Sequence, residues 1–381
     1  MNKTATYVAV IAVIAVVAVA AYVLINNNGA TPEPKPVEGI TIIDGNGNTV
    51  EIPEPIDSCM VISTSIPTAM KILNLQDKVD EILFKKASKY QEFHDAGFDI
   101  SEDAPRYADL STAEYFASKG VKYIIAPTND KSFKASLVTS CESYGIKIIY
   151  LDCYGETMLD DMEKLVKLFG STKETQDAFN AYLNLRNGIV EGVMSVVNPS
   201  DDKHFLFFMQ GLDAFYNEEA ELSKIVEKIY GKNAIRLLDM SPGSSVTVKG
   251  NVDGMLESLT DKNASTPVGL LLVRMSADDS ADAVASKWMS TSIKNYNLDY
   301  IDGYDSEVYV IDSDLLSGPM DYIGYVAMAE VSGFETGYSV SELVSGYLEL
   351  YGFHKDATTL IWNLTFDDDG DLLEVVDAGI E

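Results

Sequence analysis

The chain has 381 residues, 46% of them hydrophobic, and a formal net charge of −31 from 59 acidic and 28 basic residues. A surface this negative repels nucleic acid and anionic lipid headgroups, which argues against a nucleic-acid-binding function. Three cysteines are too few for a disulfide scaffold, and Cys59 and Cys153, which lie in or beside apolar runs, are expected to be buried thiols. Three scattered histidines argue against a zinc or manganese site built from imidazoles.

The first predicted element is a membrane-spanning helix. Residues 7–25 carry no charge, and their length at 1.5 Å per residue spans about 28 Å, close to the hydrocarbon thickness of a bilayer. Residues 26–38 contain three prolines and are expected to form an extended spacer. Lys3 favours an N-terminus inside the cell, and an export signal removed near Ala21 is the alternative. In both cases we expect the body outside the cell, and in the first case it stays tethered to the membrane.

The body begins with a predicted hairpin at residues 40–52, because alternating apolar residues flank a turn-forming Asp-Gly-Asn-Gly sequence. Short apolar strands then alternate with amphipathic helices. The strands are predicted at 59–62, 121–126 and 147–151, and the helices at 67–75, 131–144 and 156–169. This alternation predicts a parallel sheet covered by helices.

A long helix and a second α/β unit follow. Residues 173–197 contain no proline. Six of them recur at helical spacing and so fall on one face of a helix: Phe179, Leu183, Arg186, Val190, Val193 and Val197. A helix of about 25 residues extends nearly 37 Å and is expected to join the two units. The second unit is predicted from strands at 204–208, near 246, at 268–273 and at 308–311, and from helices at 220–230 and 252–259.

These elements predict an α/β protein of two Rossmann-like lobes with central sheets flanked by helices. The lobes are bridged by one long α-helix, and an N-terminal transmembrane helix precedes them. The expected divisions are an anchor and spacer at 1–38, an N-terminal lobe at 39–170, a connecting helix at 171–199, a C-terminal lobe at 200–355 and an acidic tail at 356–381.

The order of these elements resembles the periplasmic binding proteins of ABC importers for iron–siderophore, haem and cobalamin. The resemblance covers about residues 39–353 and depends on five segments in order: the hairpin 41–53, the strand and helix at 61–75, the helix and strand at 109–126, the strand at 144–151, and the strand, turn and helix at 306–330. It is weaker in the second half, because residues 264–272 lack the usual proline–aspartate approach to the strand.

The resemblance implies two rigid lobes that hold a ligand in a cleft lined by residues just past strand ends, as is general for open α/β sheets. The ligand-binding candidates are Ser63, Ser65, Arg106, Tyr107, Thr128, Asn129, Tyr154, Met209, Gln210, Ser244, Arg274, Met275 and Met320. It also implies that Glu114 and Asp253, with Glu257 as a rival, contact arginines of a membrane permease. No cofactor and no protein-bound metal are expected.

Each of these candidates also has an ordinary structural explanation. Glu114 closes a Ser-x-x-Glu capping box that begins at Ser111, and Asp253 suits a helix N-terminus. Arg106 and Arg274 are able to bind a carboxylate with two parallel bonds, but a surface ion pair is the commoner role of an arginine in so acidic a chain. The tyrosines and methionines are also common core residues.

Two further patterns lie outside the predicted cleft. The acidic run 367–371 is similar to a calcium loop, but Val376 falls where that loop needs its bidentate glutamate, so a solvated tail is favoured. Asn263 and Asn363 each begin a glycosylation sequon, a short pattern that arises easily by accident.

The favoured function is capture of an iron chelate of the siderophore type and its delivery to an ABC permease and ATPase complex. A cobalamin, another corrinoid or haem is the alternative ligand. We expect no enzyme activity, because the sequence has no GxSxG, Walker loop or HExxH motif. A surface-anchored enzyme on the same two-lobed scaffold and a structural adhesion protein are alternatives of other classes. A tethered receptor favours a cell without an outer membrane, such as an archaeon.

Overall fold

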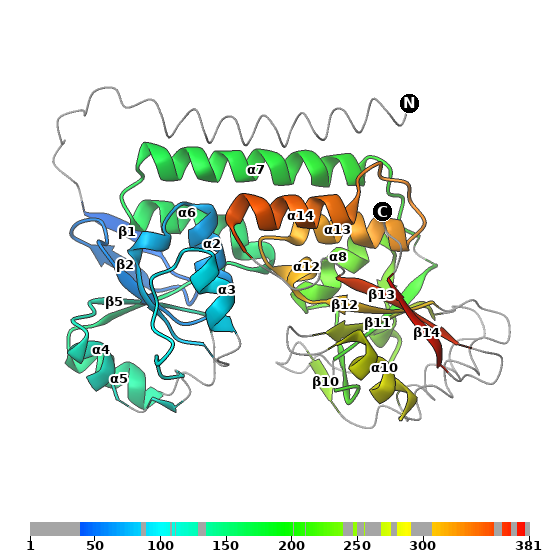
Figure 1. Cartoon of the computed structure of the whole chain (residues 1–381), viewed down its shortest axis with the longest axis horizontal. Helices are drawn as coiled ribbons and strands as arrows, with labels where there is room; N and C mark the ends of the chain where they lie inside the picture. The colour runs from blue at the N-terminus through cyan, green and yellow to red at the C-terminus, as the bar shows by residue number, and fades with distance from the viewer. Residues whose placement is uncertain are drawn as a thin grey trace. The chain divides into compact units, whose positions relative to one another are not determined.

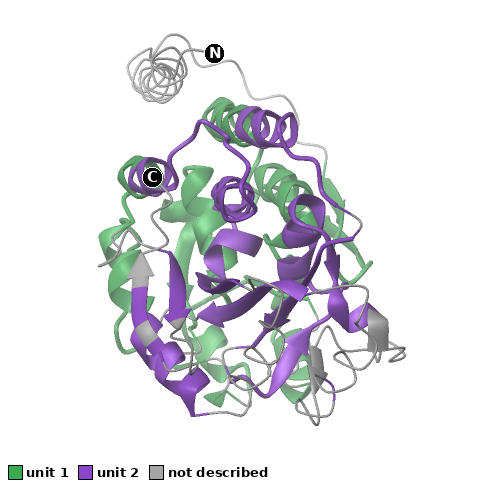
Figure 2. Ribbon diagram, turned by 90° about the vertical axis from the view of Figure 1, so that its right-hand side faces the viewer, with its two compact units in different colours: residues 1–186, 346–356 green, residues 187–345, 357–381 purple. Residues whose placement is uncertain are grey.

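The computed structural model describes residues 39–84, 89–106, 109–110, 112–128, 135–200, 202–209, 211–238, 247–249, 255, 268–275, 280–290, 307–353, 360–366 and 372–377. The predicted anchor and spacer at 1–38 and the predicted helix at 252–259, apart from Met255, lie outside these ranges. Within them, no helix is both long and apolar enough to cross a membrane. The chain divides into unit 1, residues 1–186 and 346–356, and unit 2, residues 187–345 and 357–381 (Figure 2).

Unit 1 is built on a parallel sheet (Figure 1). The hairpin of β1 (Ile40–Ile43) and β2 (Thr49–Ile52) is antiparallel, as predicted. The sheet has the order β4-β3-β5-β6, with every neighbouring pair parallel. Its strands are β3 (Cys59–Val61), β4 (Val79–Ile82), β5 (Tyr123–Ala126) and β6 (Lys147–Tyr150). Its helices are α2 (Ser65–Ile72), α3 (Tyr90–Asp95), α4 (Glu114–Ser118), α5 (Ala135–Ser143) and α6 (Met158–Leu168).

Helices cover both faces of this sheet (Figure 1). On one face, Phe116 of α4 and Leu137 of α5 pack with Met60 and Ile124 of the strands in one buried cluster. On the other face, α6 buries Met162 and Leu165 and lies beside α2. Burial of this apolar surface favours the folded state by roughly 25 cal/mol per Å². The central strands β3 and β5 are buried on both faces, which explains why they are continuous apolar runs in the sequence.

The long helix α7 (Lys173–Met194) confirms the helix predicted at 173–197, and it buries Phe179 and Val193 of the predicted face. The boundary between the two units falls inside α7, after Arg186. A second boundary falls inside α14 (Val340–Tyr351), after Ser345. The chain therefore changes unit twice within helices, where each residue is fixed by backbone hydrogen bonds. The predicted domain limits stay predictions.

Unit 2 contains a mixed sheet with the order β10-β8-β7-β11-β12-β13-β14, and β9 also pairs with β7. The central strands β7, β11 and β12 are parallel, whereas β8, β10, β13 and β14 pair antiparallel. The strands are β7 (His204–Phe208), β8 (Ala214–Tyr216), β9 (Lys232–Asn233), β10 (Thr247–Lys249), β11 (Val268–Met275), β12 (Glu307–Asp312), β13 (Ile361–Phe366) and β14 (Leu372–Asp377). The helices are α8 (Glu221–Ile229), α10 (Ala281–Met289), α12 (Asp314–Ser317) and α13 (Asp321–Val331).

The core of unit 2 lies between this sheet and α10. Trp288 of α10 is fully buried, and its ring meets that of Phe208 edge to face at 5.5 Å between centroids. Val273 and Val310 of the parallel strands belong to the same cluster. An α/β fold with helices against its sheets is therefore confirmed, while the antiparallel strands β8, β13 and β14 were not predicted.

Two of these antiparallel strands correct the expectation of an acidic tail at 356–381. β13 pairs with β12, and β14 pairs with β13, so both belong to the sheet of unit 2. Leu364 is buried in the core, which gives β13 an apolar face that the high acid content of the region conceals. The candidate calcium loop at 367–371 lies between these strands and outside the described residues.

A buried histidine makes the stability of unit 2 depend on pH. Burial lowers the pKa of His204 at the start of β7, although the Asp202 backbone opposes the shift. The unfolded chain therefore takes up the proton first, and stability is lost as the pH falls from about 6.5 toward the lower folded pKa. A separation of one pH unit between the two pKa values corresponds to about 1.4 kcal/mol. We expect urea unfolding of the wild type and of His204→Gln to differ less at pH 5.5 than at pH 7.5, whereas a pH-independent difference contradicts this assignment.

Candidate functional site

Each unit has one point where neighbouring parallel strands connect in opposite directions. In unit 1, the chain leaves β3 for β4 on one side and then crosses to β5 on the other. In unit 2, the next strand parallel to β7 is β9, which pairs with it on one side, and the one after that is β11, on the other side. The carboxyl ends of such strand pairs are the usual ligand site of open α/β sheets. Ser63 and Thr128 follow β3 and β5, Met209 follows β7, and Arg274 lies at the end of β11.

The residues after β3 begin helix α2. Ser63 has a φ of 155°, outside the common backbone regions, and its hydroxyl accepts a hydrogen bond from the Ser65 amide at 3.1 Å. Unusual backbone conformations of this kind cost about 1–3 kcal/mol and persist where the surrounding structure imposes them. Ser63 and Ser65 are both half-buried. They present backbone and hydroxyl groups at the carboxyl edge.

Thr128 is tied to the next strand of the sheet. Its amide and hydroxyl donate to the two carboxylate oxygens of Asp152, at 2.8 and 2.5 Å. Both hydrogen-bond donors of Thr128 are therefore bonded to Asp152, and its hydroxyl group is available to a ligand as an acceptor. The methyl group of Thr128 also fills the space where a Cβ on Gly45 would lie, and the Gly45 amide donates to the Tyr150 carbonyl at 2.6 Å. The turn of the opening hairpin thus packs against the ends of β5 and β6.

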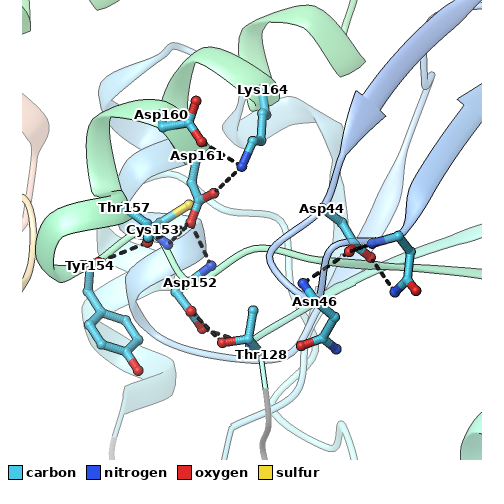
Figure 3. Close-up of polar contacts among 11 residues, drawn as sticks. Asp44, Asn46, Thr128, Asp152, Cys153, Tyr154, Thr157, Asp160, Asp161 and Lys164 are labelled. Carbon is cyan, nitrogen blue, oxygen red and sulfur yellow. Dashed lines mark hydrogen bonds and ion pairs between the residues drawn. The ribbon is translucent and has the colours of Figure 1, made fainter.

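The turn between β6 and α6 is organised by a buried carboxylate (Figure 3). Asp161 of α6 accepts hydrogen bonds from the amides of Asp152 and Cys153, at 2.9 and 3.2 Å, and pairs with Lys164 at 3.1 Å. Partial burial opposes the charge of Lys164, but its bonds to Asp160 and Asp161 outweigh this effect and raise its pKa. Burial, together with the charges of Asp161 and Asp152, raises the pKa of the Cys153 thiol, which stays neutral.

Unit 2 places an arginine at its own carboxyl edge. Arg274 donates from Nη1 to the Tyr216 hydroxyl at 2.8 Å, while its Nε is buried and has no hydrogen-bond partner among the described residues. The Tyr216 ring is itself held edge to face by Phe207, at 5.2 Å between centroids. A buried donor without a partner is costly, so such a group is often completed by a ligand.

The other predicted ligand contacts have varied surroundings. Tyr154 is exposed by 37% just after β6, whereas Arg106 is exposed in an ion pair with Asp109 at 3.0 Å. Met275 is buried in the core with Trp288 and Phe208, and Met320 is buried at the N-terminus of α13, so packing accounts for both. Met209 is half-buried in the tight connection from β7 to β8. Tyr107, Asn129, Gln210 and Ser244 lie outside the described residues.

Glu114 is exposed at the first position of α4, after the cap residue Ala113. The expected capping box placed it at the third helical position, with Ser111 as the cap. The helix instead begins two residues later, so Glu114 does not have the geometry of that box. Its charge favours the helix N-terminus and points to solvent. Asp253 and its rival Glu257 lie outside the described residues.

Three residues of these edges were not found from the sequence. Asp152 satisfies the same rule as Tyr154, since both follow β6. Tyr216 lies on β8, a strand of three residues that is too short to show a periodic pattern. Asp161 is within a helix, and only the return of α6 over the turn brings its carboxylate to the Asp152 and Cys153 amides.

The edge of unit 1 offers hydrogen-bond acceptors and the Tyr154 ring, and the edge of unit 2 offers the Tyr216 ring and the Arg274 guanidinium group. In the described residues, no three histidine, cysteine or acidic side chains come together in a way that holds a metal ion. The three cysteines are free and buried, as predicted for Cys59 and Cys153. Each edge by itself is suited to contact an oxygen-rich ligand, unit 1 by hydrogen bonds and unit 2 by charge.

Comparisons with known proteins identify the fold. No model of a known protein family matches the chain, and no curated protein is similar enough in sequence to count as a match. The TroA-like periplasmic binding protein FepB from Veillonella parvula matches with a TM-score of 0.61 and 12% identity, over 86% of this chain and 100% of its own. The chain has the fold of the TroA-like periplasmic binding proteins. The predicted resemblance is thereby confirmed at the level of the fold.

Two further solved structures with this fold are similar across most of the chain. An ABC-type Fe3+-hydroxamate transport protein from Saccharomonospora viridis has a TM-score of 0.55 and 15% identity, over 78% of this chain and 100% of its own. CeuE from Helicobacter pylori, with Ni(II) bound, has a TM-score of 0.53 and 16% identity, over 84% of this chain and 98% of its own. At these identities the likeness extends to the fold alone.

Proposed function

We propose that this protein is the substrate-binding component of an ABC importer and that it captures a metal chelate, with an iron–siderophore as the first choice. The main support is the match to the whole length of a TroA-like binding protein. Residues at the strand ends of both units add to it, above all Arg274 with its unpartnered buried Nε. A cobalamin, another corrinoid or haem is the alternative cargo.

The proposed mechanism is reversible binding without a chemical step. The guanidinium group of Arg274 binds an anionic oxygen of the chelate, because its planar fork matches paired oxygen acceptors. Tyr154 supplies an aromatic face and a phenol group, and the hydroxyl oxygen of Thr128 supplies an acceptor. The metal arrives within its chelate as cargo, so the protein needs no metal ligands of its own.

The same proposal places the body outside the cell, held near its permease by residues 1–38. The strongly negative net charge of −31 suits a soluble body that does not adhere to anionic lipid headgroups. The permease and its ATPase are the proposed partners, with the exposed Glu114 as one contact and Asp253 as the other.

Binding without turnover is the first test of this function. The full chain should bind ferrioxamine B, cyanocobalamin or haemin, with a change in tryptophan fluorescence or a raised melting temperature, because a ligand that binds only the folded state stabilises it. Both tryptophans, Trp288 and Trp362, belong to unit 2 and report on it. No response to any of these ligands, combined with hydrolysis of a general substrate panel, would favour an enzyme instead.

The second test concerns the permease. The double variant Glu114→Ala, Asp253→Ala should bind the chelate as the wild type does, yet lose its uptake into cells that carry the importer. Loss of two carboxylates removes the charges that would pair with basic residues of a permease. Unchanged uptake of radiolabelled chelate by the double variant rules out this docking role.

A further inference from the structure

The turn between β6 and α6 is held by side-chain hydrogen bonds to two of its backbone amides. It follows the last residue of β6, Tyr150, and enters α6 at Met158 through one turn of 3₁₀ helix (Gly155–Thr157). Within it, Cys153 has a φ of 51°, in the left-handed region that a residue with a Cβ enters only at a cost of about 1 kcal/mol or more. Something must therefore hold the turn in this conformation.

The group that holds it is the carboxylate of Asp161, whose side chain is 2% exposed. One oxygen, Oδ2, accepts hydrogen bonds from the amides of Asp152 and Cys153 and from the Thr157 hydroxyl, at 2.9, 3.2 and 3.2 Å. The other oxygen, Oδ1, accepts from Lys164 at 3.1 Å. Hydrogen bonds to an ionised group are roughly twice as strong as neutral ones, and this carboxylate has all its contacts inside the protein. It therefore fixes two successive amides of the turn.

A second carboxylate connects the turn to the switch point of the sheet. The amide of Asp152 is bound by Asp161. The carboxylate of Asp152 accepts hydrogen bonds from the amide and the hydroxyl of Thr128, which follows β5. The two aspartates thus join α6, the end of β6 and the end of β5 in one continuous hydrogen-bonded network. Figure 3 shows this network between Lys164 and Thr128, and shows the ring of Tyr154 directed away from Asp161 and Lys164.

We propose that Asp161 is a positioning residue for ligand capture, which acts by fixing the turn that presents Tyr154 at the carboxyl edge of unit 1. This inference rests on the proposed function, since it names Tyr154 as the ligand contact that Asp161 serves. A side chain that is already held in its binding conformation loses less conformational entropy when the ligand arrives. The hydrogen bonds of Asp161 offset the strain at Cys153 and keep the backbone that leads to Tyr154 in that state.

The first arm of the experiment needs no ligand. In Asp161→Asn, the side-chain NH2 group replaces one acceptor oxygen beside Lys164 and the turn donors, so the amides of Asp152 and Cys153 should exchange with solvent at least about tenfold faster. The 19F resonance of fluorotyrosine at Tyr154, assigned from its loss in Tyr154→Phe, should shift or broaden. Asp160→Asn is the matched control. Asp160 pairs with the same Lys164 at 2.7 Å and is next along the same helix, but the structure shows it exposed and bound to none of the turn amides.

The second arm uses a double-mutant cycle with ferrioxamine B, haemin and cyanocobalamin as probes. For the probe that the wild type binds most tightly, Asp161→Asn should weaken binding about tenfold, but should change it little when Tyr154→Ala is already present. If Asp161→Asn fails to fold, Thr157→Val takes its place, because it removes only the hydroxyl donor and leaves the carboxylate. Its expected effect has the same pattern and is smaller.

The outcomes separate the two proposals. If the wild type binds none of the probes, the proposed function fails, and the exchange and 19F measurements still decide whether Asp161 fixes the turn and Tyr154. Unchanged exchange and an unchanged Tyr154 resonance in Asp161→Asn overturn the inference whatever the ligand. Equal weakening of binding in the presence and absence of the Tyr154 ring also overturns it, since Asp161 then acts through stability alone.

Discussion

Replacing Gly324 by alanine should destabilise unit 2 by about 3 kcal/mol, at the upper end of the usual cost of overpacking. Gly324 is buried in α13, where an added Cβ would overlap the carbonyl oxygen of Leu315 in the neighbouring helix α12. That oxygen is backbone, so it cannot move aside by changing a rotamer. The two helices must separate instead, and the contacts of Leu315 and Leu316 with the core are weakened.

A second helical glycine is the matched control for this substitution. Gly188 of α7 is exposed, and an added Cβ would meet nothing within 4 Å. Gly188→Ala should therefore stabilise the protein by about 0.5–1 kcal/mol, because alanine has the better helix propensity. Both glycines belong to unit 2, so urea unfolding followed by tryptophan fluorescence measures the two variants with the same probes. Equal effects of the two alanines would show that the contact with Leu315 is not what sets the cost.

The central parallel strands were predictable because burial on both faces leaves a continuous apolar run in the sequence. The edge strand β4 was not predicted, because its sequence is not such a run. β4 contains the adjacent acids Asp80 and Glu81, and Glu81 is buried, accepts the Ser101 amide at 3.0 Å and has its pKa raised by burial. In the sequence alone, two adjacent acids indicate a loop, because the amide that bonds Glu81 is not apparent there. β14, at the edge of the sheet of unit 2, is mostly apolar, but it follows the acidic run 367–371, which conceals it in the sequence.

The residues of the candidate site also fall into those that the sequence predicts and those that it does not. The strand-end rule identified Thr128, Tyr154 and Arg274, since it requires only the place of each strand in the chain. The same rule also selected Met275, which faces the core, because a strand end alone does not reveal to which face a side chain points. The role of Asp161 depends on a helix that folds back over a turn, a relation with no fixed spacing in the sequence.

Replacing Arg274 by methionine should weaken binding of an anionic chelate roughly 10- to 100-fold, the equivalent of the 1.5–3 kcal/mol typical of a hydrogen bond to a charged group. Methionine keeps most of the side-chain volume, so the packing beside Tyr216 is retained while the charge and the donors are lost. The unliganded protein should lose little stability, because the change also removes a buried Nε that has no partner in the described part of the chain. Titration with haemin, whose two propionate groups are anionic, and urea unfolding measure the two quantities separately.

Arg106→Met is the matched control, because it removes an arginine that is exposed and already paired. Both arginines were selected from the sequence for the same reason, but the side chain of Arg106 is 58% exposed and already pairs with Asp109. An exposed ion pair contributes little to stability. The exposed guanidinium group of Arg106 also has no buried donor that a ligand would satisfy. Arg106→Met should therefore leave affinity unchanged. If both variants bind as the wild type does, the buried Nε of Arg274 has a purely structural role, whereas equal losses in both would indicate long-range attraction of the anion by overall charge, which higher salt would suppress.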